Sequence, residues 1–177
     1  MSILKILGLK SENEEEKSNS ETDTIQKITQ TLKSMDPEKA RFHALFAANL
    51  ARVAQADLHI SEQEIQAMEK ILVKLGHLTL DMACLVVEMA KSHNELFGGV
   101  ENYLITREFH KIASQEEKYH LVECLYAIAA ADENISEAEN KEVEKIAREL
   151  QVTHQELLAL RHDFREHLAV LKDLPKK

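Results

Sequence analysis

Two stretches of the chain decide its fold, because their sequences closely resemble each other. Leu125 to Leu150 reads LYAIAAADENISEAENKEVEKIAREL, and Leu50 to Leu75 reads LARVAQADLHISEQEIQAMEKILVKL. With a shift of 75 residues and no gap, 12 of these 26 positions are identical. The identities run through the central loop as well as the flanking helical patterns. The match therefore predicts a duplicated helix–corner–helix unit.

Each copy carries the signals of one helix ending and another beginning. An aspartate, Asp57 or Asp132, stands at the end of the first helix, where its short side chain can bond freed backbone groups. Four residues later comes a Ser-x-x-Glu capping box, Ser61 to Glu64 in one copy and Ser136 to Glu139 in the other. The sequence thus predicts two equivalent corners, each rich in oxygen ligands.

Similar start and stop signals predict the rest of an all-α fold. The chain has only 4 Gly and 2 Pro, and Asp36-Pro37 is a strong helix start. Residues 25–32 suggest one or two further helical turns. We expect a single compact domain of about seven core helices in two pseudo-symmetric halves, about 36–97 and 100–171, joined near Gly98-Gly99. Their expected ranges are about 36–56, 61–75, 79–93, 101–112 and 114–131, with further helices starting at 136 and 153.

The N-terminal region has a different composition. Residues 11–22 lack apolar side chains, and we expect residues 1–24 to form an amphipathic N-terminus with an acidic, disordered linker ahead of a helical domain over 25–177. Residues 1–10 carry five aliphatic side chains with Lys5 and Lys10 and no acid. Such a piece suits a membrane surface, the groove of a protein partner, or the chain's own domain.

Composition excludes several classes of protein. The net charge of −9 argues against a nucleic-acid partner, whose phosphates require a basic face. No apolar run approaches the length of a membrane span, and no secretory signal is evident. Cys84 and Cys124 lie in apolar helical stretches without CxxC spacing, so we expect reduced, buried thiols. Together these features predict a cytoplasmic protein with, at most, peripheral membrane contact.

The twice-repeated pattern A-x-A-D-x-x-I-S-x-x-E resembles the TerB-like proteins of the tellurite resistance protein B superfamily. The resemblance is closest to a branch of bacterial members and extends over roughly residues 38–165. It implies a helical domain with pseudo-twofold symmetry, a stress-related setting, and acidic corners that take a divalent cation. The family commonly has Gly after the aspartate, whereas this chain has Leu58 and Glu133. We therefore expect a weakly held ion that keeps several waters.

The candidate metal ligands all offer the hard oxygen atoms that Ca²⁺, Mg²⁺ and Mn²⁺ prefer. The spacing departs from an EF-hand loop, and a capping role alone explains the same Ser and Glu residues. The candidate ligands are Asp57, Ser61 and Glu64 in the first corner, and Asp132, Asn134, Ser136 and Glu139 in the second.

No phosphate-binding loop, nucleophile elbow or zinc motif occurs in the sequence, so no catalytic residue is predicted. The leading hypothesis is a non-enzymatic binding or scaffold module for a protein partner, tuned by a divalent cation. A metal-dependent enzyme of unknown substrate is the alternative. A peripheral membrane protein held by residues 1–10 is a third hypothesis, and the oligomeric state stays open.

Overall fold

Five of the described helices begin at a residue whose side chain accepts a bond from one of their first backbone N–H groups. The computed structural model describes residues 19–54, 62–92, 102–131 and 135–167, without the side chains of 19–24, 62–64 and 165–167. Eight α-helices and one 3-10 turn occupy these ranges, and no β-strand occurs in them, which confirms the all-α class. The elements are α2 (Asn19–Ser34), α3 (Pro37–Ala54), α4 (Glu62–Lys74), α5 (Leu80–Lys91), α7 (Asn102–Ile112), α8 (Gln115–Ala129), α9 (Glu137–Glu149), α10 (His154–Arg161) and η1 (His162–His167).

The predicted caps account for these starts. Asp36 Oδ1 accepts hydrogen bonds from the N–H groups of Glu38 (3.0 Å) and Lys39 (3.2 Å) at the start of α3. Complete capping boxes open α8, α9 and α10, with Ser114, Ser136 and Thr153 as the capping residues. These four helix starts were legible from sequence because a local side-chain bond fixes each one.

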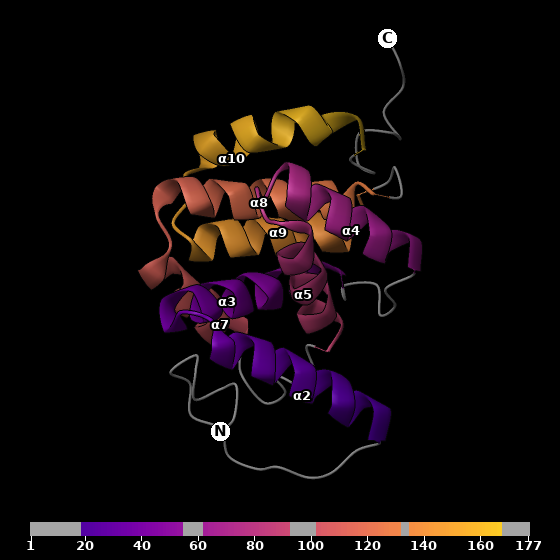
Figure 1. Ribbon diagram of the computed structural model, residues 1–177. Helices are drawn as coiled ribbons and strands as arrows, with labels where there is room; N and C mark the ends of the chain where they lie inside the picture. The colour runs from indigo at the N-terminus through magenta and orange to yellow at the C-terminus, as the bar shows by residue number, and fades with distance from the viewer. Residues whose placement is uncertain (1–18, 55–61, 93–101, 132–134, 168–177) are drawn as a thin grey trace.

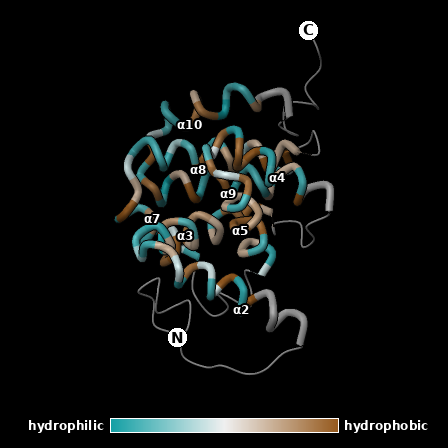
Figure 2. Tube along the Cα trace, in the orientation of Figure 1, coloured by the Kyte–Doolittle hydropathy of each residue, from teal (hydrophilic) through white to brown (hydrophobic). Residues whose placement is uncertain are grey.

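Helices α3 and α8 form the centre of the bundle. In Figure 1, α8, α9 and α10 lie together at one end, α2 lies at the other, and α3 and α7 lie between them. Helix α3 packs against α5, α7, α8 and α9, while α8 also packs against α4 and α10. The hydropathy colouring in Figure 2 is mixed along most helices, as expected of helices with one buried face.

Helix α2 is longer than the sequence predicts. It begins at Asn19, inside the segment predicted as a linker, and runs for 16 residues. Ile28 and Leu32 are only 2% and 1% exposed, because α2 packs on α3 and α5. Such tertiary packing stabilises polar flanking turns that have little helical tendency of their own.

The two cysteines differ. Cys124 in α8 is buried, as predicted, and burial raises the pKa of its thiol to about 12. The prediction was wrong for Cys84, which is half-buried in α5. Desolvation, followed by the neighbouring carboxylate of Glu69, raises the pKa of that thiol.

Among the helices described, none is both long and apolar enough to cross a bilayer.

Candidate functional site

The predicted acidic corners lie mostly outside the part of the chain that the structure describes. Asp57 and Ser61 fall in the undescribed range 55–61, and Asp132 and Asn134 fall in 132–134. Glu64 belongs to α4, but its side chain is not described. The metal hypothesis therefore stays a prediction for these five residues.

The two described candidates, Ser136 and Glu139, lie together at the start of α9. The Ser136 N–H donates to Glu139 Oε2 at 2.8 Å, and Ser136 Oγ accepts from the Glu139 N–H at 3.1 Å. Ile135, just before them, is 1% exposed and packs in the core. Both polar side chains are thus engaged as a helix cap, and a bound ion would have to share them. Within the described residues, no three His, Cys, Asp or Glu side chains are grouped as metal ligands.

A buried arginine lies just before the first corner, and the sequence analysis missed it. The Arg52 side chain, in the last turn of α3, is 0% exposed. Its Nε donates to Glu142 Oε1 at 2.8 Å, an oxygen that also lies 2.6 Å from Nη2. Its Nη1 donates to Glu149 Oε2 at 2.8 Å. Arg52 therefore joins the end of α3 to two carboxylates of α9 that lie seven residues, about two helical turns, apart.

Neutral polar groups complete this cluster, which we call the Arg52 network. Arg52 Nη1 also donates to the hydroxyl of Thr106 in α7. That hydroxyl donates to Asn49 Oδ1 at 2.7 Å, and Asn49 Nδ2 donates to the Leu45 carbonyl at 2.8 Å. Asn49 and Thr106 are both 0% exposed, so the network carries polar bonding through the core between α3, α7 and α9.

One signal in the sequence could have revealed the network. Arg52 and Asn49 lie in the apolar stretch ALFAANLARVA of α3, where a helix with few polar residues is buried on most sides. A charge in such a helix needs a partner of opposite charge. The sequence does not identify that partner, because Glu142 and Glu149 lie about 90 residues further along the chain.

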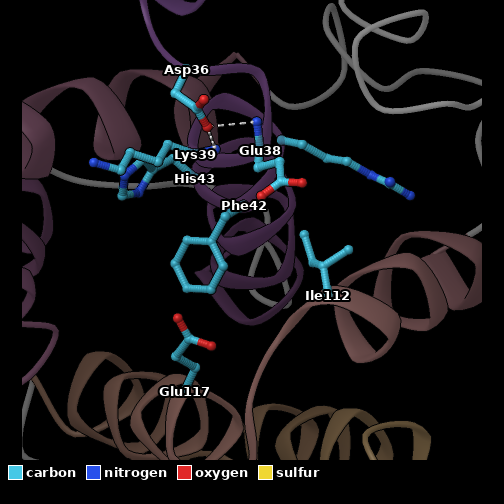
Figure 3. A pocket seen from close by; sticks show the side chains of 8 residues that line it. Asp36, Glu38, Lys39, Phe42, His43, Ile112 and Glu117 are labelled. Carbon is cyan, nitrogen blue, oxygen red and sulfur yellow. Dashed lines mark hydrogen bonds between the residues drawn. The ribbon is translucent and has the colours of Figure 1, made fainter.

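A groove of about 670 Å³ lies beside the start of α3. We call it the α3 groove, and Figure 3 shows Phe42 and Ile112 facing each other across it, with Asp36, Glu38 and Glu117 around them. Phe42 is held from behind by Phe109, with ring centroids 5.2 Å apart. The residues that line the α3 groove are Asp36, Glu38, Lys39, Arg41, Phe42, His43, Ile112 and Glu117.

Most charged groups of the α3 groove already have partners. Asp36 caps α3, and Glu117 Oε2 accepts the Ser114 N–H at 2.7 Å in the capping box of α8. Arg41 Nη2 lies 2.6 Å from Glu108 Oε2. Glu38 has no ion-pair or hydrogen-bond partner through its carboxylate among the described residues. The groove thus combines an apolar floor with one carboxylate that is open to an incoming cation.

Titration in and beside the groove follows from its surroundings. Burial, with a smaller contribution from the Lys39 charge, lowers the pKa of His43, so its imidazole is neutral near pH 7. Burial opposes ionisation of Glu108, but the hydrogen bond from Lys111 and the nearby cations outweigh it and lower its pKa. With the pKa of His43 and of Glu108 both lowered, neither group is expected to change its protonation state above pH 7.

Comparison with known proteins gives one match. A family model described as Tellurite resistance protein TerB matches residues 43–162. The match takes in most of α3, all of α4 to α10, and the corners between them. No curated protein and no solved structure matches the chain. A family match over about two thirds of the chain establishes membership, and the chain belongs to the TerB family of tellurite resistance proteins.

Proposed function

We propose that this TerB-family chain is a non-enzymatic binding module that holds a divalent cation weakly at its acidic corners and binds a protein partner. The observation that carries the proposal is the bracing of the second corner. On one side, the Ala130 N–H donates to the Tyr126 carbonyl at the end of α8. On the other, Ser136 and Glu139 lock the start of α9. The described residues on both sides of the second corner are therefore held in place by hydrogen bonds.

Chain length limits where the undescribed ligands can lie. Four peptide units separate Asp132 from Ser136, and an extended chain spans at most about 14 Å over that distance. We infer that the carboxylate of Asp132 and the amide of Asn134 add their oxygen atoms to those of the cap to form a site for Ca²⁺, Mg²⁺ or Mn²⁺.

The Arg52 network supports the same role for the first corner. Arg52 lies five residues before Asp57 and is held by carboxylates of α9, the helix that follows the second corner. The end of α3 is therefore fixed against the helix that leaves the other corner. A module that presents ligands from rigid helix ends favours binding with little rearrangement.

We favour binding over catalysis because most carboxylates of the α3 groove already hold helix ends. Two of its three carboxylates, Asp36 and Glu117, accept backbone N–H bonds as helix caps. These two carboxylates are occupied in holding helix ends, so neither is free to turn toward a bound substrate. We accordingly favour a cytoplasmic, stress-related binding role over a metal-dependent enzyme.

Isothermal titration calorimetry with Ca²⁺ and with Mn²⁺ tests the cation proposal. We expect a saturable heat at millimolar metal, a Kd at least tenfold higher in Asp132→Ala, and a smaller change in Asp57→Ala. Metal at ten times its Kd should stabilise the fold by about 1.4 kcal/mol. Glu116→Ala, which removes an exposed acid from α8, is the matched control and should leave the Kd unchanged.

If the wild-type protein gives no binding heat at millimolar metal, the cation proposal is overturned. Equal loss of binding in Asp132→Ala and Glu116→Ala would also overturn it, because it would indicate nonspecific attraction to an acidic protein. Co-purification from the native cell, with and without chelator, tests the partner separately.

A further inference from the structure

The α3 groove has a floor that is exposed and apolar. Ile112 is 37% exposed at the end of α7, and Phe42 is half-buried across from it (Figure 3). The aromatic rings of Phe46 and Phe109 lie behind Phe42, with centroids 5.9 and 5.2 Å away. The floor is therefore built into the core and does not depend on a mobile side chain. It suits two or three aliphatic side chains of an incoming segment.

The rim of the groove selects for positive charge. Asp36, Glu38 and Glu117 stand around the floor, against the ammonium group of Lys39 (Figure 3). The other cation, Arg41, is paired with Glu108 at 2.6 Å, a carboxylate that it shares with Lys111. Glu38 is exposed and has no partner among the described side chains. A segment with lysines beside aliphatic residues complements both the rim and the floor.

The chain itself contains such a segment. Residues 1–10, MSILKILGLK, hold five aliphatic side chains, two lysines and no acid. We propose that residues 1–10 dock in the α3 groove of their own chain. The segment then occupies the surface that a basic amphipathic segment of a partner would use.

The connection is long enough for this return. Helix α2 has 16 residues, a length of about 24 Å, and its end at Ser34 lies two residues from Asp36 on the groove rim. Eight residues, 11–18, separate the segment from α2, and eight extended residues span at most about 26–29 Å, which is enough to reach back to the groove rim.

Photo-crosslinking in the full-length chain tests the docking. Ile112→p-benzoylphenylalanine places the probe on the groove floor. Leu158→p-benzoylphenylalanine, at a site in α10 that is 42% exposed, is the control of similar size and exposure. After irradiation at low micromolar protein, mass spectrometry should find crosslinks from position 112 to residues 1–10 within one chain. Position 158 should give none to that segment.

Charge reversal then tests the recognition. Glu38→Lys, and separately the pair Lys5→Glu and Lys10→Glu, should each lower the crosslink yield at least fivefold. Combining the three changes should restore part of it. Circular dichroism of each variant checks that the helices persist, which we expect because Glu38 is exposed.

Three results would overturn the proposal. They are the absence of crosslinks from position 112 to residues 1–10, crosslinks to that segment that join two chains, and a yield that charge reversal leaves unchanged. The test does not depend on the cation proposal, because no residue of either acidic corner lines the groove.

Discussion

The helix pairs α3–α4 and α8–α9 have the same spacing along the sequence, but their polar contacts differ. Helices α4 and α9 both have 13 residues, and their bounds differ by 75, as do the last residues of α3 and α8. This is the shift at which the sequence repeats. That the pairs form pseudo-symmetric halves stays a prediction, but the shared start and stop signals give helices of matching length.

The polar contacts between the pairs do not follow the repeat. At the shift of 75, Arg52 corresponds to Ala127, Asn49 to Cys124, and Glu149 to Lys74. The bonds of the Arg52 network therefore have no counterpart at the repeat. The comparison teaches that caps and apolar positions define the helices, while a few unrepeated polar residues fix how the helices join.

The largest expected effect comes from breaking this network, which the repeat does not duplicate. Arg52→Met leaves the partly buried carboxylates of Glu142 and Glu149 without their cation, and we expect a loss of about 3 kcal/mol in the free energy of unfolding. Urea denaturation followed by circular dichroism measures it.

Lys74→Met is the control for this substitution, because exposed Lys74 is the counterpart of Glu149 and has no ion pair among the described residues. We expect it to cost less than about 0.5 kcal/mol. If Arg52→Met lowers the free energy of unfolding by less than 1 kcal/mol, the network does not stabilise the packing of the helices.

Helix caps and long-range contacts differ in how well they could be predicted from the sequence. Helix starts such as Asp36 and Ser136 were predicted correctly, because a cap is a bond between residues two or three apart. The Arg52 network and the α3 groove were not predicted, since each joins residues far apart in sequence. Of the seven predicted metal ligands, the structure describes the side chains of Ser136 and Glu139 and finds them in a cap, while the ion itself stays untested.

A second contrast concerns the junctions after α4 and after α9. The first contains Gly76, where an added Cβ would lie 2.7 Å from the Leu72 carbonyl oxygen. The second has Gln151 in the left-handed region with φ 62°, and the Val152 N–H bonds back to the Ala147 carbonyl at 3.0 Å. In the first junction it is His77 that has the positive φ, 52°, so the chain turns one residue later relative to the repeat.

Substitutions at these junctions should have opposite signs. Gly76→Ala should lower the free energy of unfolding by about 1–3 kcal/mol, because backbone atoms must move apart. Gln151→Gly should raise it by about 0.5–1 kcal/mol, since glycine tolerates a positive φ. Thermal denaturation of both variants checks the contrast, and a neutral Gly76→Ala would show that the close approach relaxes freely.

The two predicted caps offer a sharper test of equivalence. Ser136→Ala removes the acceptor of the Glu139 N–H and should cost about 1 kcal/mol. If the corners are equivalent, Ser61→Ala should cost about the same. Urea denaturation of both variants makes the comparison, with Ser114→Ala in α8 as a reference cap. A Ser61→Ala variant as stable as the wild type would break the predicted equivalence at its first corner.

The smallest expected effect is a dependence on pH that originates on the α3–α7 side. Glu108 of α7 lies 2.6 Å from Arg41 of α3 and 2.6 Å from Lys111, and its pKa in the folded chain lies below the ordinary 4.5. A carboxyl whose pKa is lowered by folding contributes stability above its unfolded pKa. That stability disappears as pH falls through the folded pKa.

Glu108 should therefore stabilise the chain at neutral pH and lose its contribution below about pH 4.5, by on the order of 0.5 kcal/mol because Arg41 is partly exposed. Glu108→Gln should make the unfolding free energy less dependent on pH between 5 and 3, as measured by urea denaturation at each pH. Its counterpart at the shift of 75 is Lys33, an exposed residue of α2, and Lys33→Gln should leave the slope as in the wild type. An unchanged slope in Glu108→Gln would mean that Arg41 and Lys111 interact with this carboxylate no more strongly in the folded chain than in the unfolded one. The join between α3 and α7 would then depend on the Arg52–Thr106 bond and on apolar packing.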